Sequence, residues 1–162
     1  MVPVNDPVRR RLGLDRKSAL IIDENSYSRK IIADICYSLD LGSALTAKSG
    51  ERGLAALKAK RFDLMILDGA PPDWLEFVAL VRASDNESIK SIPIILLKAQ
   101  AKPSDVAAAR EAGVTEFLTR PFSAQMLLDR VVRIFSTPRD FVNTQPLSVR
   151  VGDRMAMPAG KC

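Results

Sequence analysis

Between residues 18 and 135, short apolar runs alternate with longer segments of helical periodicity. Each apolar run has four or five residues and is flanked by polar or turn-forming residues, as is typical of buried strands. This pattern predicts five strands, at residues 18–22, 44–47, 63–67, 94–97 and 116–119.

The segments between the strands place apolar residues three and four positions apart, as helices with one buried face do. Ile31, Ile32 and Ile35 share one face of the first such segment, and Gly113 is a helix C-cap signal. Strand–helix units repeated five times predict an α/β fold with a five-stranded parallel sheet, doubly wound as (βα)5. The expected helices cover residues 26–39, 49–60, 74–82, 104–112 and 123–135.

The two ends of the chain lack this pattern. Residues 1–17 form a basic N-terminal extension with two prolines, and residues 136–162 form a C-terminal extension with three. We expect one domain at residues 18–135, with Phe141 and Val142 as candidates for packing the C-terminal extension against it.

Composition narrows the class of protein. The chain has 162 residues, 47% of them apolar, which is enough for one domain with a buried core. The sequence has no apolar run near the ~20 residues of a membrane helix and no signal-peptide core. Histidine is absent, which excludes Ser-His-Asp catalysis and histidine-containing zinc sites. Cys36 and Cys162 lie far apart, which fits a reducing cytoplasm.

The net charge of +5 arises at the ends of the chain, because residues 18–135 carry equal numbers of basic and acidic side chains. A nucleic-acid reader usually concentrates its positive charge on a folded face. The distribution therefore argues against nucleic acid as a partner, and the lack of a membrane segment argues against a membrane.

Carboxylates follow two of the expected strands. Asp23 and Glu24 follow the first, and Asp68 follows the third. The carboxyl ends of parallel strands share one edge of the sheet, where open α/β folds place their ligands. Oxygen ligands suit Mg²⁺, so these three acids and the carbonyl of Ala70 form a candidate Mg²⁺ site. The alternative explanation of the same acids is a set of strand-end caps, which their joint placement at one edge disfavours.

The same residues carry a resemblance to a family. The chain resembles the receiver domains of bacterial response regulators, of the chemotaxis-type single-domain kind with a flavodoxin-like fold. The resemblance covers about residues 18–135 and rests on five signals in the family's order. They are Leu20-Ile21-Ile22-Asp23-Glu24-Asn25, Phe62-Asp63-Leu64-Met65-Ile66-Leu67-Asp68, Pro72 in the loop that follows, Ile92-Pro93-Ile94-Ile95-Leu96-Leu97, and Ala112-Gly113-Val114-Thr115-Glu116-Phe117-Leu118-Thr119-Arg120-Pro121-Phe122.

The resemblance implies that Asp68 accepts a phosphoryl group from a histidine kinase or a phosphotransfer protein. It also implies that Mg²⁺ bridges Asp68 to Asp23 and Glu24. In the family a hydroxyl residue and a lysine then bind the phosphoryl oxygens.

This chain departs from the family at both of those positions, which makes it an atypical variant. The hydroxyl position is Lys98 and the lysine position is Arg120. Lys98 either pairs with Asp68 or Glu24 in the resting state or points into water. Arg120 either binds phosphoryl oxygens or makes a structural pair with an aspartate. The loop after Asp68 is also short, and the switch aromatic is Phe117, which has no hydroxyl.

Three functions remain open, none of them enzymatic. The first is a phosphorylatable receiver, and the second is a pseudo-receiver that phosphorylation does not switch. The third is a flavodoxin-like small-molecule binder. This chain has no glycine-rich phosphate loop after residue 22, which argues against that function. In either receiver the output leaves through a downstream protein partner or a homodimer formed by residues 104–135, with Gln125 and Arg130 as expected surface residues.

Overall fold

The computed structural model of the chain describes residues 7–136, 149–151 and 154–156, and for the last two segments it describes the backbone. The expectations for Phe141, Val142 and Cys162 therefore lie outside the described residues.

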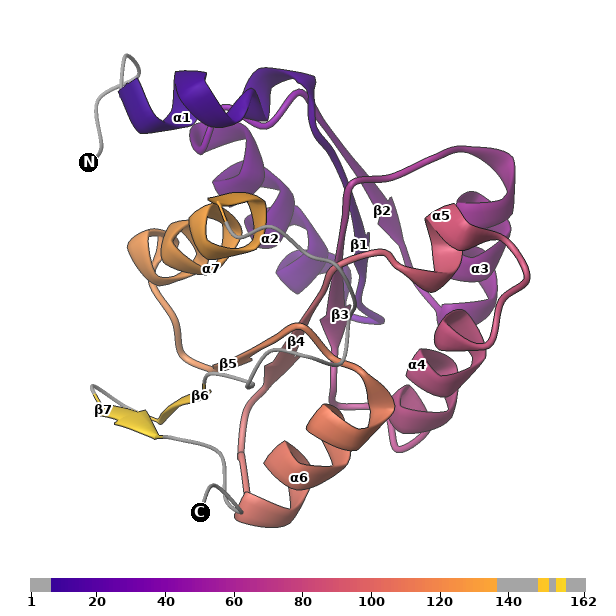
Figure 1. Ribbon diagram of the computed structural model, residues 1–162. Coiled ribbons are helices and arrows are strands. Elements are labelled where there is room, and N and C mark those ends of the chain that lie inside the picture. The colour runs from indigo at the N-terminus through magenta and orange to yellow at the C-terminus, as the bar shows by residue number, and fades with distance from the viewer. Residues whose placement is uncertain (1–6, 137–148, 152–153, 157–162) are drawn as a thin grey trace.

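Five parallel strands form the centre of the sheet, in the order β2-β1-β3-β4-β5 (Figure 1). Their pairing places Ile22 opposite Leu67, and Asp68 opposite Leu97, so the carboxyl ends of the central strands reach the same edge. The predicted five-stranded parallel sheet is confirmed. The strands are β1 (Ser18–Ile22), β2 (Ser43–Ala47), β3 (Leu64–Asp68), β4 (Ile94–Lys98) and β5 (Glu116–Thr119).

Helices cover both faces of this sheet, as doubly wound folds require (Figure 1). On one face lie α2 (Ser26–Ser38) and α7 (Ala124–Ser136), and on the other lie α3 (Gly50–Ala59), α4 (Trp74–Arg82), α5 (Glu87–Lys90) and α6 (Pro103–Ala112). Alternate strand residues enter different cores: Ile21 packs with the α2–α7 layer and Ile22 with the α3–α4–α6 layer. Both faces of β1, β3 and β4 are buried, which explains their nearly continuous apolar sequences.

The helix ends follow local signals in the sequence. The side chain of Asn25 accepts the backbone N–H of Ser28 at the start of α2, and Ser49 accepts that of Arg52 at the start of α3. Gly113 ends α6 with a φ of 97°, which favours glycine. The five predicted helices are present, whereas α5 was not predicted, because four residues give no readable periodicity.

The N-terminal segment also forms elements that its sequence does not predict, α1 (Pro7–Leu12) and the 3₁₀ turn η1 (Leu14–Arg16). Leu14 is completely buried in the α2–α7 core. Arg9 is buried as well, and its Nη1 lies 3.1 Å from both Oδ2 of Asp40 and the carbonyl oxygen of Ser38. One leucine and one ion pair therefore fix a segment too short to show a helical repeat.

Two short strands extend the sheet beyond β5. Strand β6 (Val149–Val151) pairs parallel with β5, and β7 (Arg154–Ala156) pairs antiparallel with β6. The sequence of residues 136–162 predicts no strand, because three-residue strands give no usable alternation. In this molecule β5 is an internal strand of the sheet.

The expectation that Arg130 lies on the surface is wrong. Its side chain is 1% exposed, and its Nε lies 3.9 Å from Oε2 of the buried Glu116. Position 130 falls on the buried face of α7, three residues after Leu127 and four before Ile134. Gln125 is exposed, as expected.

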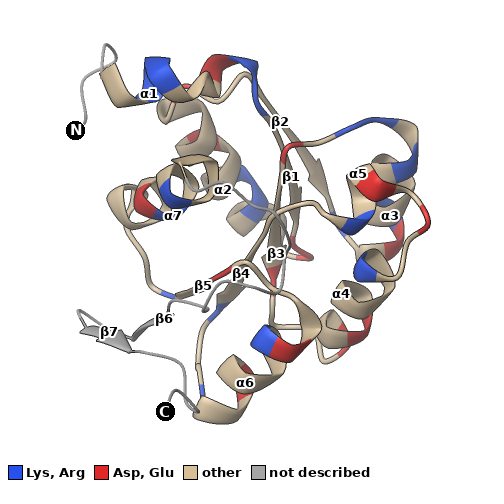
Figure 2. Cartoon of the chain, in the orientation of Figure 1, with Lys and Arg blue, Asp and Glu red and all other residues tan. Residues whose placement is uncertain are grey.

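Among the described residues, no helix combines the length and the apolar character needed to cross a membrane. Basic and acidic residues are mixed over both helical layers of the described part (Figure 2). The prediction that nucleic acid is not a partner stays a prediction.

Candidate functional site

The candidate site lies where β1 and β3 end. The chain leaves β1 toward α2 on one face of the sheet and leaves β3 toward α4 on the other, which opens a crevice at the carboxyl edge. The crevice has a volume of about 400 Å³. Its lining includes Asp23, Asn25, Ser28, Asp68, Ala70, Lys98, Gln100 and Arg120.

Asp68 stands at the last position of β3 with its side chain 11% exposed. Its Oδ1 accepts the backbone N–H of Ala70 at 3.2 Å. Burial, followed by the negative charge of Asp23, raises the pKa of Asp68 above its ordinary value. The Ala70 hydrogen bond and the charge of Arg120 oppose this rise in pKa but do not cancel it.

Asp23 is 3% exposed and is held from two sides. Its Oδ1 accepts the backbone N–H of Asn25 at 2.9 Å, and its Oδ2 lies 3.2 Å from Nη2 of Arg120. The strand-end cap that the sequence suggests is thus present at Asp23. The capping bond uses one carboxylate oxygen and leaves the other facing the crevice.

Arg120 contacts both buried carboxylates. Its Nη2 lies 3.2 Å from Oδ2 of Asp23 and 3.7 Å from Oδ1 of Asp68. Its backbone N–H donates to the carbonyl of Lys98 at 3.0 Å, which ties the residue after β5 to the end of β4. The alternative of a structural Arg–Asp pair is therefore realised, at the position where the family has a lysine.

Lys98 follows neither of the two orientations expected for it. Its Nζ donates to the carbonyl oxygen of Gly69 at 3.2 Å, and among the described contacts it makes no ion pair with Asp68 or Glu24. The physical reason is that Arg120 already faces the carboxylates, so the lysine takes the next acceptor at the rim. Its charge stays beside the crevice and is half-buried.

The short loop after Asp68 is tied to the neighbouring strand. The N–H of Gly69 donates to the carbonyl of Leu97 at 2.7 Å, and a Cβ on Gly69 would lie 3.1 Å from that oxygen. A side chain at this position would crowd that oxygen, so glycine is favoured for this close approach. Trp74, the first residue of α4, is 8% exposed, and its backbone N–H donates to the carbonyl of Pro71. The loop that carries Ala70 is thus fixed at both ends.

The candidate metal ligands are only partly brought together. Asp23 and Asp68 face one another, whereas Glu24 is exposed. Among the described residues no group of three His, Cys, Asp or Glu side chains is close enough to hold a metal ion. Mg²⁺ often takes only one or two carboxylates and keeps several waters. A site made by two carboxylates and the Ala70 carbonyl fits that habit, although Arg120 already supplies a positive charge to it.

Phe117, at the position of the switch aromatic, and Ser28, at the edge of the crevice, remain to be placed. Phe117 is completely buried in the α3–α4–α6 core, so it packs as a core residue. Ser28 was not singled out from the sequence, yet its buried Oγ borders the crevice without a hydrogen-bond partner. The signal that points to it is the Asn25 cap, which places the first turn of α2 beside Asp23.

Comparison with known proteins gives a consistent result. The family model of the response regulator receiver domain matches residues 19–132. The chain is 30% identical over 118 residues to chemotaxis protein CheY of Pseudomonas aeruginosa, covering 72% of this chain and 94% of that protein. It is 28% identical over 116 residues to CheY-3 of Vibrio cholerae, covering 72% of this chain and 89% of that protein.

Solved structures resemble the chain as well. The chemotaxis response regulator CheY4 of Vibrio cholerae superimposes with a TM-score of 0.66 at 26% identity, covering 74% of this chain and 98% of that one. A putative response regulator from Chloroflexus aurantiacus gives a TM-score of 0.68 at 27% identity, covering 75% of this chain and 99% of that one.

Proposed function

The chain belongs to the response regulator receiver domain family of two-component signalling, and we propose that it receives a phosphoryl group on Asp68. The observation that carries this proposal is the position of Asp68, largely but not fully buried at the end of β3 beside Asp23 and within 3.7 Å of the Arg120 guanidinium. The donor is the phosphohistidine of a histidine kinase or of a phosphotransfer protein, since this chain has no histidine of its own.

The transfer needs positioning and charge stabilisation more than covalent chemistry. Oδ1 of Asp68 is held by the Ala70 N–H and faces Arg120, so Oδ2 attacks phosphorus. The new bond is P–O, the P–N bond breaks, and the electron pair returns to the imidazole of the donor, which then takes a proton. Arg120 offers two parallel N–H groups to the phosphoryl oxygens, and Lys98 at the rim adds a second positive charge.

Mg²⁺ is a candidate cofactor of this step. Asp23, Asp68 and the carbonyl of Ala70 would hold it, and the ion would neutralise charge on the phosphoryl oxygens. Arg120 lowers the local negative charge that attracts the ion, so we expect weak binding. The exposed Glu24 would contact the ion only through water.

The output is proposed to leave through the surface formed by residues 104–135, toward a downstream protein or a second copy of the chain. A signalling module of this kind acts through binding and not through turnover of a substrate. A cytoplasmic location remains a prediction.

The second candidate is a pseudo-receiver whose state phosphorylation does not change. It is favoured by one contact: Lys98 donates to the Gly69 carbonyl, at the position where the family has a hydroxyl that follows the phosphoryl group. The third candidate, a flavodoxin-like small-molecule binder, is disfavoured by the family match. The chain after β1 begins with the Asp23–Asn25 turn and not with a glycine-rich loop.

Phosphorylation with acetyl phosphate and Mg²⁺, resolved on a phosphate-affinity gel, tests the proposal. A retarded band is expected for the wild type and for Asp85→Asn, an exposed carboxylate far from the crevice, but not for Asp68→Asn. A wild-type chain that gives no retarded band at any donor concentration would support the pseudo-receiver instead.

A further inference from the structure

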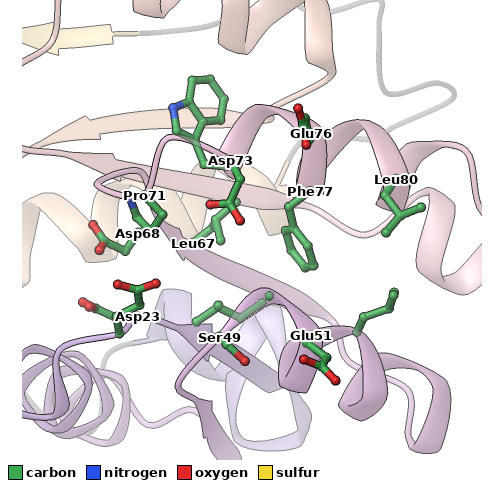
Figure 3. A pocket seen from close by; sticks show the side chains of 15 residues that line it. Asp23, Ser49, Glu51, Leu67, Asp68, Pro71, Asp73, Glu76, Phe77 and Leu80 are labelled. Atoms are coloured by element: carbon green, nitrogen blue, oxygen red, sulfur yellow. The ribbon is translucent and has the colours of Figure 1, made fainter.

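A second cavity lies between α3 and α4 (Figure 3), and Asp23 and Asp68 line both this cavity and the crevice already described. Its volume is about 560 Å³, which falls within the range of small-molecule sites. From it we propose a binding site for a small organic cation, namely an amine or guanidine that carries an aromatic or branched aliphatic group.

The walls of the cavity are apolar. Phe77 on α4 faces α3 across it (Figure 3). The contact is close, because a Cβ on Gly50 would lie 3.1 Å from the Phe77 ring. Leu80 lines the outer end with 54% of its surface exposed, which leaves apolar area for a ligand to cover. Ile22, Leu54, Leu67, Pro71 and Trp74 complete the apolar lining.

All charged side chains that line the cavity are negatively charged. Six of the fifteen lining residues carry carboxylates, and none of the fifteen is a lysine or arginine: Asp23, Glu24, Glu51, Asp68, Asp73 and Glu76. This is unusual in a chain with a net charge of +5. Arg120 balances Asp23 and Asp68 from the neighbouring crevice, and the described contacts give the other four no ion pair with a lysine or arginine.

The helix dipole explains only part of this charge. Glu51 and Glu76 lie in the first turns of α3 and α4, where a carboxylate stabilises a helix. Asp73 is the N-cap residue of α4, so helix N-termini account for three of the six carboxylates and for none of the exposed apolar surface. Glu51 and Glu76 belong to the opposite walls α3 and α4, and the Glu76 carboxylate lies on the side of α4 away from α3 (Figure 3).

The arrangement selects the class of ligand. A bare metal ion does not suit it, because no three acids of the described residues converge on one point and the walls are apolar. An anion is repelled by the carboxylates. A compact organic cation satisfies both features, since its body covers Phe77 and Leu80 while its charge is attracted by the carboxylates that line the cavity. Phe77, Leu80, Glu51 and Glu76 take no part in the phosphoryl transfer, whereas Asp23 and Asp68 line both this cavity and the crevice.

Titration with 4-phenylbutylamine tests the proposal, with the neutral 4-phenylbutanol and the anionic 4-phenylbutyrate as matched probes. Fluorescence of Trp74, the single tryptophan of the chain, and amide chemical shifts report binding. For a ligand of this size we expect saturable binding of the amine with a Kd on the order of millimolar. The alcohol is expected to bind at least about threefold more weakly and the carboxylate not to bind.

Variants place the site. The double variant Glu51→Gln/Glu76→Gln should weaken the amine about threefold to tenfold and leave the alcohol unchanged. The matched control Glu87→Gln/Glu111→Gln, two exposed acids outside the cavity, should bind the amine as the wild type does. Leu80→Ser should weaken both the amine and the alcohol.

Three results would overturn the proposal. They are equal affinity for amine and alcohol, an equal effect of the two double variants, and shifted amides that map away from α3 and α4. Binding of a lysine-rich peptide in the absence of amine binding would replace the small ligand by a protein segment. Circular dichroism of each variant confirms that a loss of binding is not a loss of fold.

Discussion

Nη2 of Arg120 lies 3.2 Å from Oδ2 of Asp23, and this ion pair joins the residue after the last central strand to the residue after the first. The same guanidinium reaches Asp68 at 3.7 Å. The pocket therefore contains a positive charge that belongs to the chain itself. Its presence makes three properties testable: cation binding, the response to phosphorylation and the dependence of stability on pH.

Arg120→Gln should increase the affinity for Mg²⁺, because the ion then no longer competes with a guanidinium for Asp23 and Asp68. Unfolding in urea should show a loss of about 1–2 kcal/mol, less than the loss of a fully buried partner, because Arg120 is 27% exposed. Calorimetric titration with Mg²⁺ measures the first effect. Lys30→Gln removes one positive charge from an exposed pair and serves as the control. Equal Mg²⁺ affinity in the wild type and Arg120→Gln would mean that Arg120 does not compete with the metal.

Lys98→Thr should enlarge the response to phosphorylation. The substitution frees the Gly69 carbonyl and supplies a hydroxyl that can donate to a phosphoryl oxygen. A ligand shifts a two-state equilibrium only through contacts that differ between the states, and this substitution adds one. Amide chemical shifts around Phe117 after treatment with acetyl phosphate measure the effect. Lys98→Ala removes the ammonium without adding a hydroxyl and should not reproduce it. Large shifts in the wild type, with none added by Lys98→Thr, would contradict the pseudo-receiver.

Asp68→Asn should raise the free energy of unfolding at pH 7.5. Burial and the charge of Asp23 raise the pKa of Asp68 in the folded state above its ordinary value of 3.8. Ionised Asp68 therefore costs stability at pH values above its folded pKa, and this cost vanishes as the pH falls below 3.8. The stability advantage of Asp68→Asn should accordingly shrink as the solution is acidified. Thermal unfolding between pH 7.5 and pH 3.5 checks this, with Asp85→Asn as the exposed control. An advantage that grows on acidification would reverse the sign of the argument.

Removal of residues 137–162 should promote self-association. The truncation deletes β6 and β7 and leaves the backbone of β5 without its neighbour on that side. Sedimentation velocity of the full and truncated chains at matched concentrations measures the change. A variant of the truncated chain with Ala107→Glu and Gln125→Glu, two exposed positions of α6 and α7, tests whether the surface formed by residues 104–135 takes part. A truncated chain that remains a monomer would place the interface elsewhere.

Most of the fold could be predicted from the sequence because two periodicities carry it. The central strands are buried on both faces, so their sequences are continuous apolar runs, and the main helices are long enough to repeat an apolar face. The elements that escaped prediction, α1, η1, α5, β6 and β7, have three to six residues each. The position of α1 depends on the burial of Leu14, which follows it, and on the Arg9–Asp40 ion pair. Such long-range contacts leave no periodic pattern in the local sequence.

The residues of the site could be predicted from the sequence, but the contacts that their side chains make could not. The positions of Asp23 and Asp68 follow from strand ends, whereas the contact of Lys98 depends on which acceptor its long side chain meets after Arg120 has faced the carboxylates. Glu24 differs from Asp23 by one position, and one position along a chain leaving a strand is enough to turn a side chain out of the crevice. Arg130 was placed on the surface because charge usually lies there, yet its position on α7 buries it.

The pairing of β6 with β5 changes how any partner must approach that side of the sheet. Strand β6 follows α7 in the same chain, separated from it by residues 137–148. The effective concentration of β6 at the edge of β5 is therefore set by the length of this connection and not by the concentration of the protein. A binding partner at this edge therefore competes with an intramolecular ligand. Its apparent affinity is reduced by the fraction of molecules in which the edge is already filled.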